Sequence, residues 1–176
     1  MEESGNTHSA VVARIQKAWI CWNKMKGMLM QKGLSFRLKG WMYAITVRNA
    51  MTFSAETWAV NEQDIQLMER TQMRMLRWMA GVSRKEHRTN ESIREAFHVE
   101  PISIVIRRSR LRWFGHVARR DQSHIARLCL EVDVEGKPSR GRPKLTWRAK
   151  VDNDMRSLKL KPEDALDRRK WKMLIR

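Results

Sequence analysis

The stretch PISIVIRRSRLRWFGHVARR, residues 101–120, combines apolar side chains with six arginines and holds no acid. At 100° per residue, its apolar side chains separate from a file of arginines. The apolar face holds Ile102, Val105, Ile106, Ser109, Trp113 and Val117, and the file holds Arg108, Arg112 and Arg119. Gly115 lies in the same file and adds no bulk, so a flat, charged group could approach there. The spacing predicts a helix, opened by Pro101 in its first turn, with its back in a core and a cationic strip facing outward.

The arginines of this stretch are candidate contacts to a sugar–phosphate backbone. Several closely spaced guanidinium groups, with no acid in the same helix, suit phosphate. The candidates are Arg107, Arg108, Arg110, Arg112, Arg119 and Arg120. A solvated basic face, or arginines paired with acids from elsewhere in the fold, is the alternative interpretation. The basic character of the whole chain favours phosphate binding.

Composition points to a polyanionic partner. The chain has 176 residues and a formal net charge of +17, and both of its halves are positive. Such a charge is an argument about partners and not about fold. The polar start, the two cysteines and the lack of a long apolar run predict an intracellular protein, nuclear or cytoplasmic, with no membrane span.

Helical patterns cover most of the chain and predict an all-α fold. We expect helices over 9–31 with Ser9 as N-cap, over 36–58 with Ser35 as N-cap, over 61–80 with Gly81 closing it, and over 90–98. Further helices are expected over 145–158 and from Pro162 onward, and an extended segment in the later part of 124–135. The predicted organisation is a disordered N-terminus (1–8), a helical thumb-like bundle (9–121), an extended segment with a basic Gly/Pro loop (122–144) and C-terminal helices (145–176).

Two local patterns in the first half make sharper predictions. Leu38, Met42, Ile45 and Asn49 follow one stripe of the second predicted helix. Asn61 followed by Asp64 resembles a capping box with Asp in place of the usual Glu.

A second arginine file lies on the third predicted helix. Arg70, Arg74 and Arg77 recur at i, i+4 and i+7, opposite an apolar face that includes Met68, Gln72 and Met75. Such a file is usually a solvated surface. Because it repeats the pattern of residues 101–120, it is a second candidate contact to nucleic acid.

The loop SRGRPK, residues 139–144, is a third basic candidate. Arg140, Arg142 and Lys144 surround Gly141 and Pro143, which resembles an AT-hook entering the minor groove of A·T-rich DNA. Four residues are a weak signal, and a general phosphate-binding or nuclear-import cluster is the favoured interpretation.

No catalytic or metal-binding pattern is present in the sequence. The histidines and cysteines show no CxxC, HxxxH or HExxH spacing, and no P-loop or GxSxG occurs. Asp152 and Asp154 are two residues apart, so in a helix their side chains point to different faces. Two-metal catalysis instead needs carboxylates that converge on the same ions. We therefore expect no cofactor, no metal and no enzymatic activity from this chain alone.

Several stretches together resemble one protein family. They are MTFSAETW (51–58), MRMLR (73–77) leading to AGVSR (80–84), RLRWFGHVARR (110–120), GRP (141–143) leading to Trp147, and DRRKW (167–171). Their order and spacing, over roughly residues 10–172, are similar to the region that follows the catalytic palm in reverse transcriptases of non-LTR (LINE-like) retrotransposons. Phe53 and Ser54 stand where the family segment carries Tyr and Gly.

The resemblance implies a helical thumb and downstream linker that grip a template–primer duplex. It implies RNA, DNA or an RNA–DNA hybrid as partner, with the arginine files on the backbone. The family's palm with its paired aspartates, its fingers and its endonuclease domain are not in the chain. The resemblance therefore implies a non-catalytic fragment of an RNA-directed DNA polymerase, such as a truncated element or a gene relic.

A different class of function remains as the alternative. A helical interaction or scaffold protein would use the same basic surface to bind an acidic protein. Its Met- and Trp-rich helices would then bury apolar faces by self-association.

Overall fold

The computed structural model describes residues 7–131 and 145–176, and within these ranges the chain forms helices and no strand. The all-α class predicted from the sequence is confirmed. The chain divides into two compact units, one formed by the residues up to Ser54 with Val60–Val105, the other by Ala55–Ala59 with Ile106–Arg176. The division falls inside one helix, α6 (Ile102–Ala118), and not after residue 121. The expectation for residues 1–8 falls almost wholly outside the described residues, and His8 already belongs to a helix.

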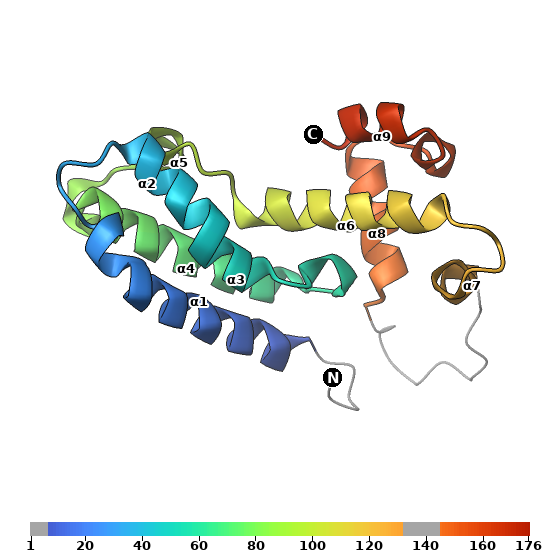
Figure 1. The fold of residues 1–176 in the computed structure, drawn as a ribbon, viewed down its shortest axis with the longest axis horizontal. Coiled ribbons are helices and arrows are strands. Elements are labelled where there is room, and N and C mark those ends of the chain that lie inside the picture. The colour runs from blue at the N-terminus through green and yellow to red at the C-terminus, as the bar shows by residue number, and fades with distance from the viewer. Residues whose placement is uncertain (1–6, 132–144) are drawn as a thin grey trace. The chain divides into compact units, whose positions relative to one another are not determined.

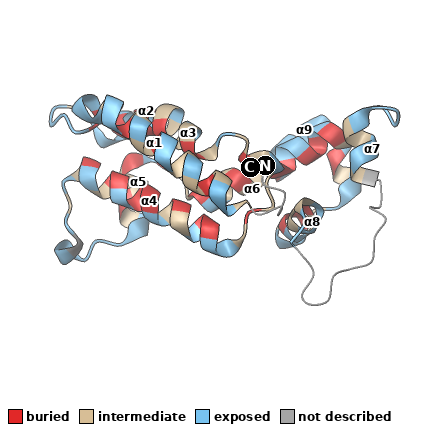
Figure 2. Cartoon of the chain, turned by 90° about the horizontal axis from the view of Figure 1, so that it is seen from below, coloured by how far each residue is buried: buried red, intermediate tan, exposed pale blue. Residues whose placement is uncertain are grey.

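The first unit is a bundle of α1 (His8–Leu29), α2 (Phe36–Tyr43), α3 (Asn49–Thr52), α4 (Glu62–Ala80) and α5 (Asn90–Phe97). Helix α1 packs against α3 and α4, and α5 packs against α2 and α4 (Figure 1). Figure 2 shows buried residues gathered on the inner faces of these helices. The largest fully buried side chains include Trp22, Tyr43, Met51, Met68, Met75, Leu76, Ile93 and Phe97.

Local capping signals set the ends of several helices. The Ser35 hydroxyl accepts from Leu38 N–H, the Asn61 side chain accepts from Asp64 N–H at 2.7 Å, and Gly81 ends α4 in the left-handed conformation at φ 67°. The predicted capping box is wrong in its second half. The Asp64 carboxylate faces His8, with 2.5 Å between Oδ1 and His8 Nδ1. Helix α1 also begins at His8 after Thr7, so the prediction of Ser9 as N-cap is wrong.

The second predicted helix is interrupted, and of its predicted stripe Met42 is buried whereas Leu38 and Ile45 are exposed. Residues Ala44–Arg48 form a π-helical turn after α2, and the helix ends near Ser54, whose φ is 65°. An extra residue in a π turn shifts the register of everything that follows. Ile45, within this turn, is 46% exposed, and Leu38, which precedes the turn in α2, is 41% exposed. The buried positions of this region are Met42, Tyr43, Val47 and Met51.

Gly40 determines which face of α2 turns inward. A Cβ built on Gly40 would lie 1.8 Å from the carbonyl oxygen of Phe97 at the end of α5. Only a residue with no side chain permits this approach of two backbones. The glycine therefore rotates the helix so that Leu38 faces outward.

We expect Gly40→Ala to destabilise the protein by about 2–3 kcal/mol, because the clash is with backbone and cannot be relieved by a rotamer change. The matched control is Gly27→Ala in α1, where nothing lies within 4 Å of the added Cβ. That change is expected to stabilise the protein by about 0.5–1 kcal/mol, since Ala favours a helix interior over Gly. Urea unfolding of both variants measures the difference, and equal stabilities would contradict the packing described for Gly40.

The second unit packs the rest of α6 with α7 (Ile125–Glu131), α8 (Trp147–Ser157) and α9 (Arg168–Leu174). Its core holds Leu111, Phe114, Val151, Met155, Ala165, Trp171 and Ile175. Two predictions are corrected here. Residues up to 131 of the predicted extended segment are helical, and the remainder of that segment lies outside the described residues. Pro162–Ala165 is a 3₁₀ turn, and the last helix begins after Asp167, whose carboxylate accepts from Arg169 and Lys170 N–H.

In the ranges that the structure describes, no helix is both long enough and apolar enough to cross a membrane.

Candidate nucleic-acid interface

An open groove lies in the first unit along α4. Its volume is about 930 Å³, and it is lined by α4, α5, the segment between them and Met30 at the end of α1. Apolar side chains of Met30, Met73, Trp78 and Val82 form part of its surface. The charged residues that line it are one glutamate, Glu69, and four arginines, Arg70, Arg74, Arg77 and Arg94. The groove is therefore cationic, with apolar patches between the charges.

Helix geometry brings three of these arginines together. Arg70, Arg74 and Arg77 follow one side of α4, opposite the buried Met68, Gln72 and Met75, as the sequence predicted. Arg70 and Arg74 are exposed and Arg77 is half-buried. Arg70 Nε donates to the Gln66 carbonyl at 3.3 Å, which directs this side chain along its own helix.

Two tryptophans hold the guanidinium of Arg74. Its central carbon lies 5.0 Å from the ring centroid of Trp78 and 5.5 Å from that of Trp19. The two indoles are themselves in contact, with centroids 5.6 Å apart. A cation over an aromatic face is fixed in position and keeps its full charge. Arg74 is therefore presented to the groove with little freedom to move.

Arg77 connects α4 to the opposite wall of the groove. Its Nη2 donates to the carbonyl of Arg88 at 2.8 Å and to Oδ1 of Asn90 at 3.1 Å. The left-handed turn at Gly81 sends the chain back toward these acceptors. Because both acceptors are neutral, the contacts fix the side chain without cancelling its charge.

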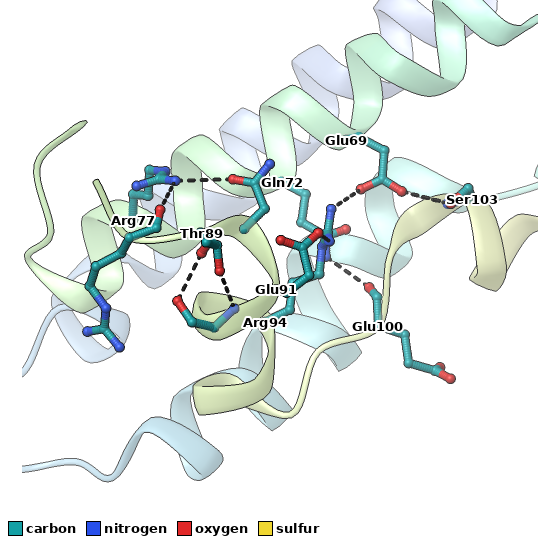
Figure 3. Close-up of polar contacts among 11 residues, drawn as sticks. Glu69, Gln72, Arg77, Thr89, Glu91, Arg94, Glu100 and Ser103 are labelled. Carbon is teal, nitrogen blue, oxygen red and sulfur yellow. Dashed lines mark hydrogen bonds and ion pairs between the residues drawn. The ribbon is translucent and has the colours of Figure 1, made fainter. Parts of the chain in front are cut away.

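Glu69 is the acid of the groove, and its carboxylate is fully engaged. Figure 3 shows it between Arg94 and the start of α6. Oε2 lies 3.2 Å from Arg94 Nη2, and Oε1 accepts from the N–H and the hydroxyl of Ser103 at 3.0 and 2.9 Å. A carboxylate at a helix N-terminus satisfies N–H groups that have no partner in the helix. Glu69 thus neutralises Arg94 and leaves the other three arginines uncompensated.

The three arginines of α4 form a candidate anion site. Within residues 7–131 and 145–176, none of the three is paired with a carboxylate. Guanidinium groups in such a row match successive anionic oxygens. The arrangement suits the binding of phosphates. In the same ranges, no three His, Cys, Asp or Glu side chains gather as a metal ion would require.

Arg110 is the clearest correction among the predicted contacts. Its side chain is buried, with Nε 2.7 Å from Asp154 Oδ2 and Nη1 3.4 Å from the Trp58 carbonyl. A guanidinium that is enclosed and paired with a carboxylate offers no charge to a phosphate. Arg110 is a structural residue of the second unit, so predicting it as a backbone contact was wrong.

Two further expectations for residues 101–120 are also wrong. The predicted apolar face includes Trp113, but 38% of the surface of this side chain is exposed. The space beside Gly115 is filled by the chain's own Trp171, since an added Cβ would lie 2.3 Å from the indole Nε1. That Nε1 donates to the carbonyl of Leu111 at 2.9 Å. The close approach permitted by Gly115 therefore serves the core and not a ligand.

The remaining predicted contacts of α6 are spread over different environments. Arg112 and Arg120 are exposed, and Arg107, Arg108 and Arg119 are half-buried. Arg119 Nη1 donates to the carbonyl of Ala165 at 2.5 Å. The pKa of Arg119 is lowered, mainly by burial and to a smaller extent by the positive charge of Arg168. Arg140, Arg142 and Lys144 lie outside the described residues.

Sequence reasoning missed two residues that shape the groove. Arg94 sits between Glu91 and Glu95 on a short helix, which gave it the appearance of an ordinary surface residue. Glu69 adjoins Arg70, but its contacts with Arg94 and Ser103 join residues 25 and 34 positions apart. One sequence signal indicates a role for an acid here. Pro101 predicts that a helix begins close to Ser103, and the N-terminus of a helix favours a nearby carboxylate.

Comparison of the chain with models of known protein families, with curated proteins and with solved structures gave no match.

Proposed function

We propose that this chain is a non-catalytic nucleic-acid-binding module that grips the sugar–phosphate backbone through the arginine groove of α4. The observation that carries the proposal is the row of Arg70, Arg74 and Arg77, held in place by aromatic and neutral partners that leave their charges intact. Backbone contacts of this kind do not distinguish base sequence. The net charge of +17 adds a long-range attraction for polyanions.

We further propose that the module derives from the thumb of a LINE-like reverse transcriptase, with RNA, DNA or their hybrid as its partner. The ordered motif resemblance supports this origin, and so does the helical architecture. One detail of backbone geometry adds support. Ser54 adopts a φ of 65°, a conformation that favours glycine, at the position where the family segment carries Gly.

Fluorescence anisotropy with labelled 20-base-pair RNA, DNA and hybrid duplexes, each in two unrelated sequences, tests the proposed function. We expect binding to every duplex, with affinities for the two sequences that agree within about threefold. Poly-L-glutamate serves as the matched polyanion without sugar or phosphate, and it should compete weakly. Absence of duplex binding, or equal competition by poly-L-glutamate, would contradict the proposal.

Self-association is a second candidate function, favoured by one specific observation. Trp41 is 59% exposed and Ile45 is 46% exposed on the outer side of the second helical region of the first unit. Apolar side chains gathered in this way are costly to leave in water. Light scattering after size exclusion, with and without nuclease treatment, separates an intrinsic oligomer from one assembled on nucleic acid.

A further inference from the structure

A pair of stacked aromatic rings lies on α6, in the second unit and outside the groove. The ring centroids of Trp113 and His116 are 5.6 Å apart, and the ring planes are inclined by only 26°. Trp113 is 38% exposed and His116 is exposed. Stacking on His116 restricts the orientation of the indole, and the part of Trp113 that stays exposed can accept another planar ring.

Hydrogen bonding keeps the His116 ring uncharged. Arg120 Nη2 lies 2.9 Å from His116 Nε2. A guanidinium carries only donors, so Nε2 must accept, and the ring proton resides on Nδ1. The pKa of His116 is lowered from its ordinary value, mainly by desolvation and then by the positive charges of Arg120 and Arg119. A neutral imidazole is an aromatic ring suited to stacking rather than a third cation.

Arginines lie beside the aromatic pair. Arg112 precedes Trp113 directly, is exposed, and has no hydrogen bond or carboxylate partner among the described residues. Arg120 is exposed and lies one turn beyond His116. Helical spacing places Arg112 on the side of α6 that carries the two rings, and Arg120, just past the end of α6 at Ala118, reaches His116 directly. The surface therefore combines a flat apolar centre with positive charge at its edges.

We propose that Trp113 and His116 form a stacking platform for an unpaired base of a single-stranded polynucleotide, with Arg112 and Arg120 contacting the flanking phosphates. Every base has a π face, so such a platform binds single strands with little regard to sequence. A duplex hides these faces, which makes the site different in kind from the groove of α4. The inference rests on the proposed function in one respect, that the chain binds nucleic acid.

The test compares two single-stranded ligands with equal phosphates: a labelled ten-residue oligodeoxyadenylate and a ten-residue abasic oligomer. Trp113→Ala should weaken binding of the first by about 5- to 100-fold, the range expected for a lost base–aromatic stack, and change binding of the second by less than about twofold. Trp113→Phe should retain most of the affinity. Trp41→Ala, which removes an even more exposed indole from the first unit, should change neither ligand.

His116→Ala guards against a folding defect, because the side chain is exposed and its loss should weaken only the adenylate ligand. Equal weakening of both ligands by Trp113→Ala and His116→Ala, or no weakening of either, overturns the platform. In that case unchanged duplex binding shows that the proposed function stands. Failure of the unaltered chain to bind either the single strands or the duplexes would instead contradict the proposed function itself.

Discussion

Replacing Arg70 and Arg74 by glutamate is expected to reduce duplex affinity by about 100-fold at 0.1 M salt. Each lost phosphate contact removes about 0.9 from the slope of log affinity against log salt, and reversed charges add repulsion. The two residues are exposed, and their known contacts are one carbonyl and two indoles, so the fold should survive. Anisotropy with the hybrid duplex measures the change.

The matched control reverses two exposed lysines elsewhere in the same unit, Lys17 and Lys24 of α1. Lys17→Glu with Lys24→Glu changes the net charge by the same amount but leaves the groove intact. We expect a loss of less than about tenfold, from the weaker general attraction alone. Equal losses in the two double variants would show that net charge, and not the groove, accounts for binding.

Asp154→Asn is expected to destabilise the protein by about 3–5 kcal/mol. The Arg110–Asp154 pair is buried at 2.7 Å, and removing one partner leaves an uncompensated charge in the interior. Such a loss is a large fraction of the stability of an ordinary domain. Thermal and urea unfolding, followed by circular dichroism, measure it.

Asp152→Asn on the same helix is the internal control. Asp152 pairs with Arg148 at 3.2 Å, but both side chains are more than 40% exposed, so the loss should be below about 0.5 kcal/mol. The double variant Arg110→Met with Asp154→Leu replaces the ion pair by apolar groups and should recover much of the stability. If Asp152→Asn and Asp154→Asn are equally mild, the buried ion pair is not a structural element.

Local signals predicted the helices and many of their ends. Ser35, Asn61 and Gly81 act within three or four residues of themselves, so the sequence alone contains the relevant chemistry. Local signals of this kind do not predict the orientation of α2. It depends on the backbone of Phe97 approaching Gly40 across 57 positions of the chain (97 minus 40). The π turn after α2 also interrupts the regular helical period on which the predicted stripe depends.

The sequence predicted the arginines of the candidate site, but it could not show which of the two arginine files is available to a ligand. Periodicity identified both arginine files, and it treated every arginine in a file as equivalent. Arg110 is buried because Asp154 reaches it from a helix 44 residues away, which no pattern within residues 101–120 records. Conversely, two arginines of the α4 file are held by residues of other elements. Trp19 of α1 contacts Arg74, and Asn90 of α5 accepts from Arg77. No pattern within α4 itself predicts these contacts.

The most direct test of the central claim is the salt dependence of duplex binding by the unaltered chain. Three uncompensated guanidinium groups on α4 predict a slope of log affinity against log salt of about −3 or steeper between 50 and 300 mM salt. A slope near zero would mean that phosphates displace no counterions on binding. That result would contradict a backbone grip by these arginines.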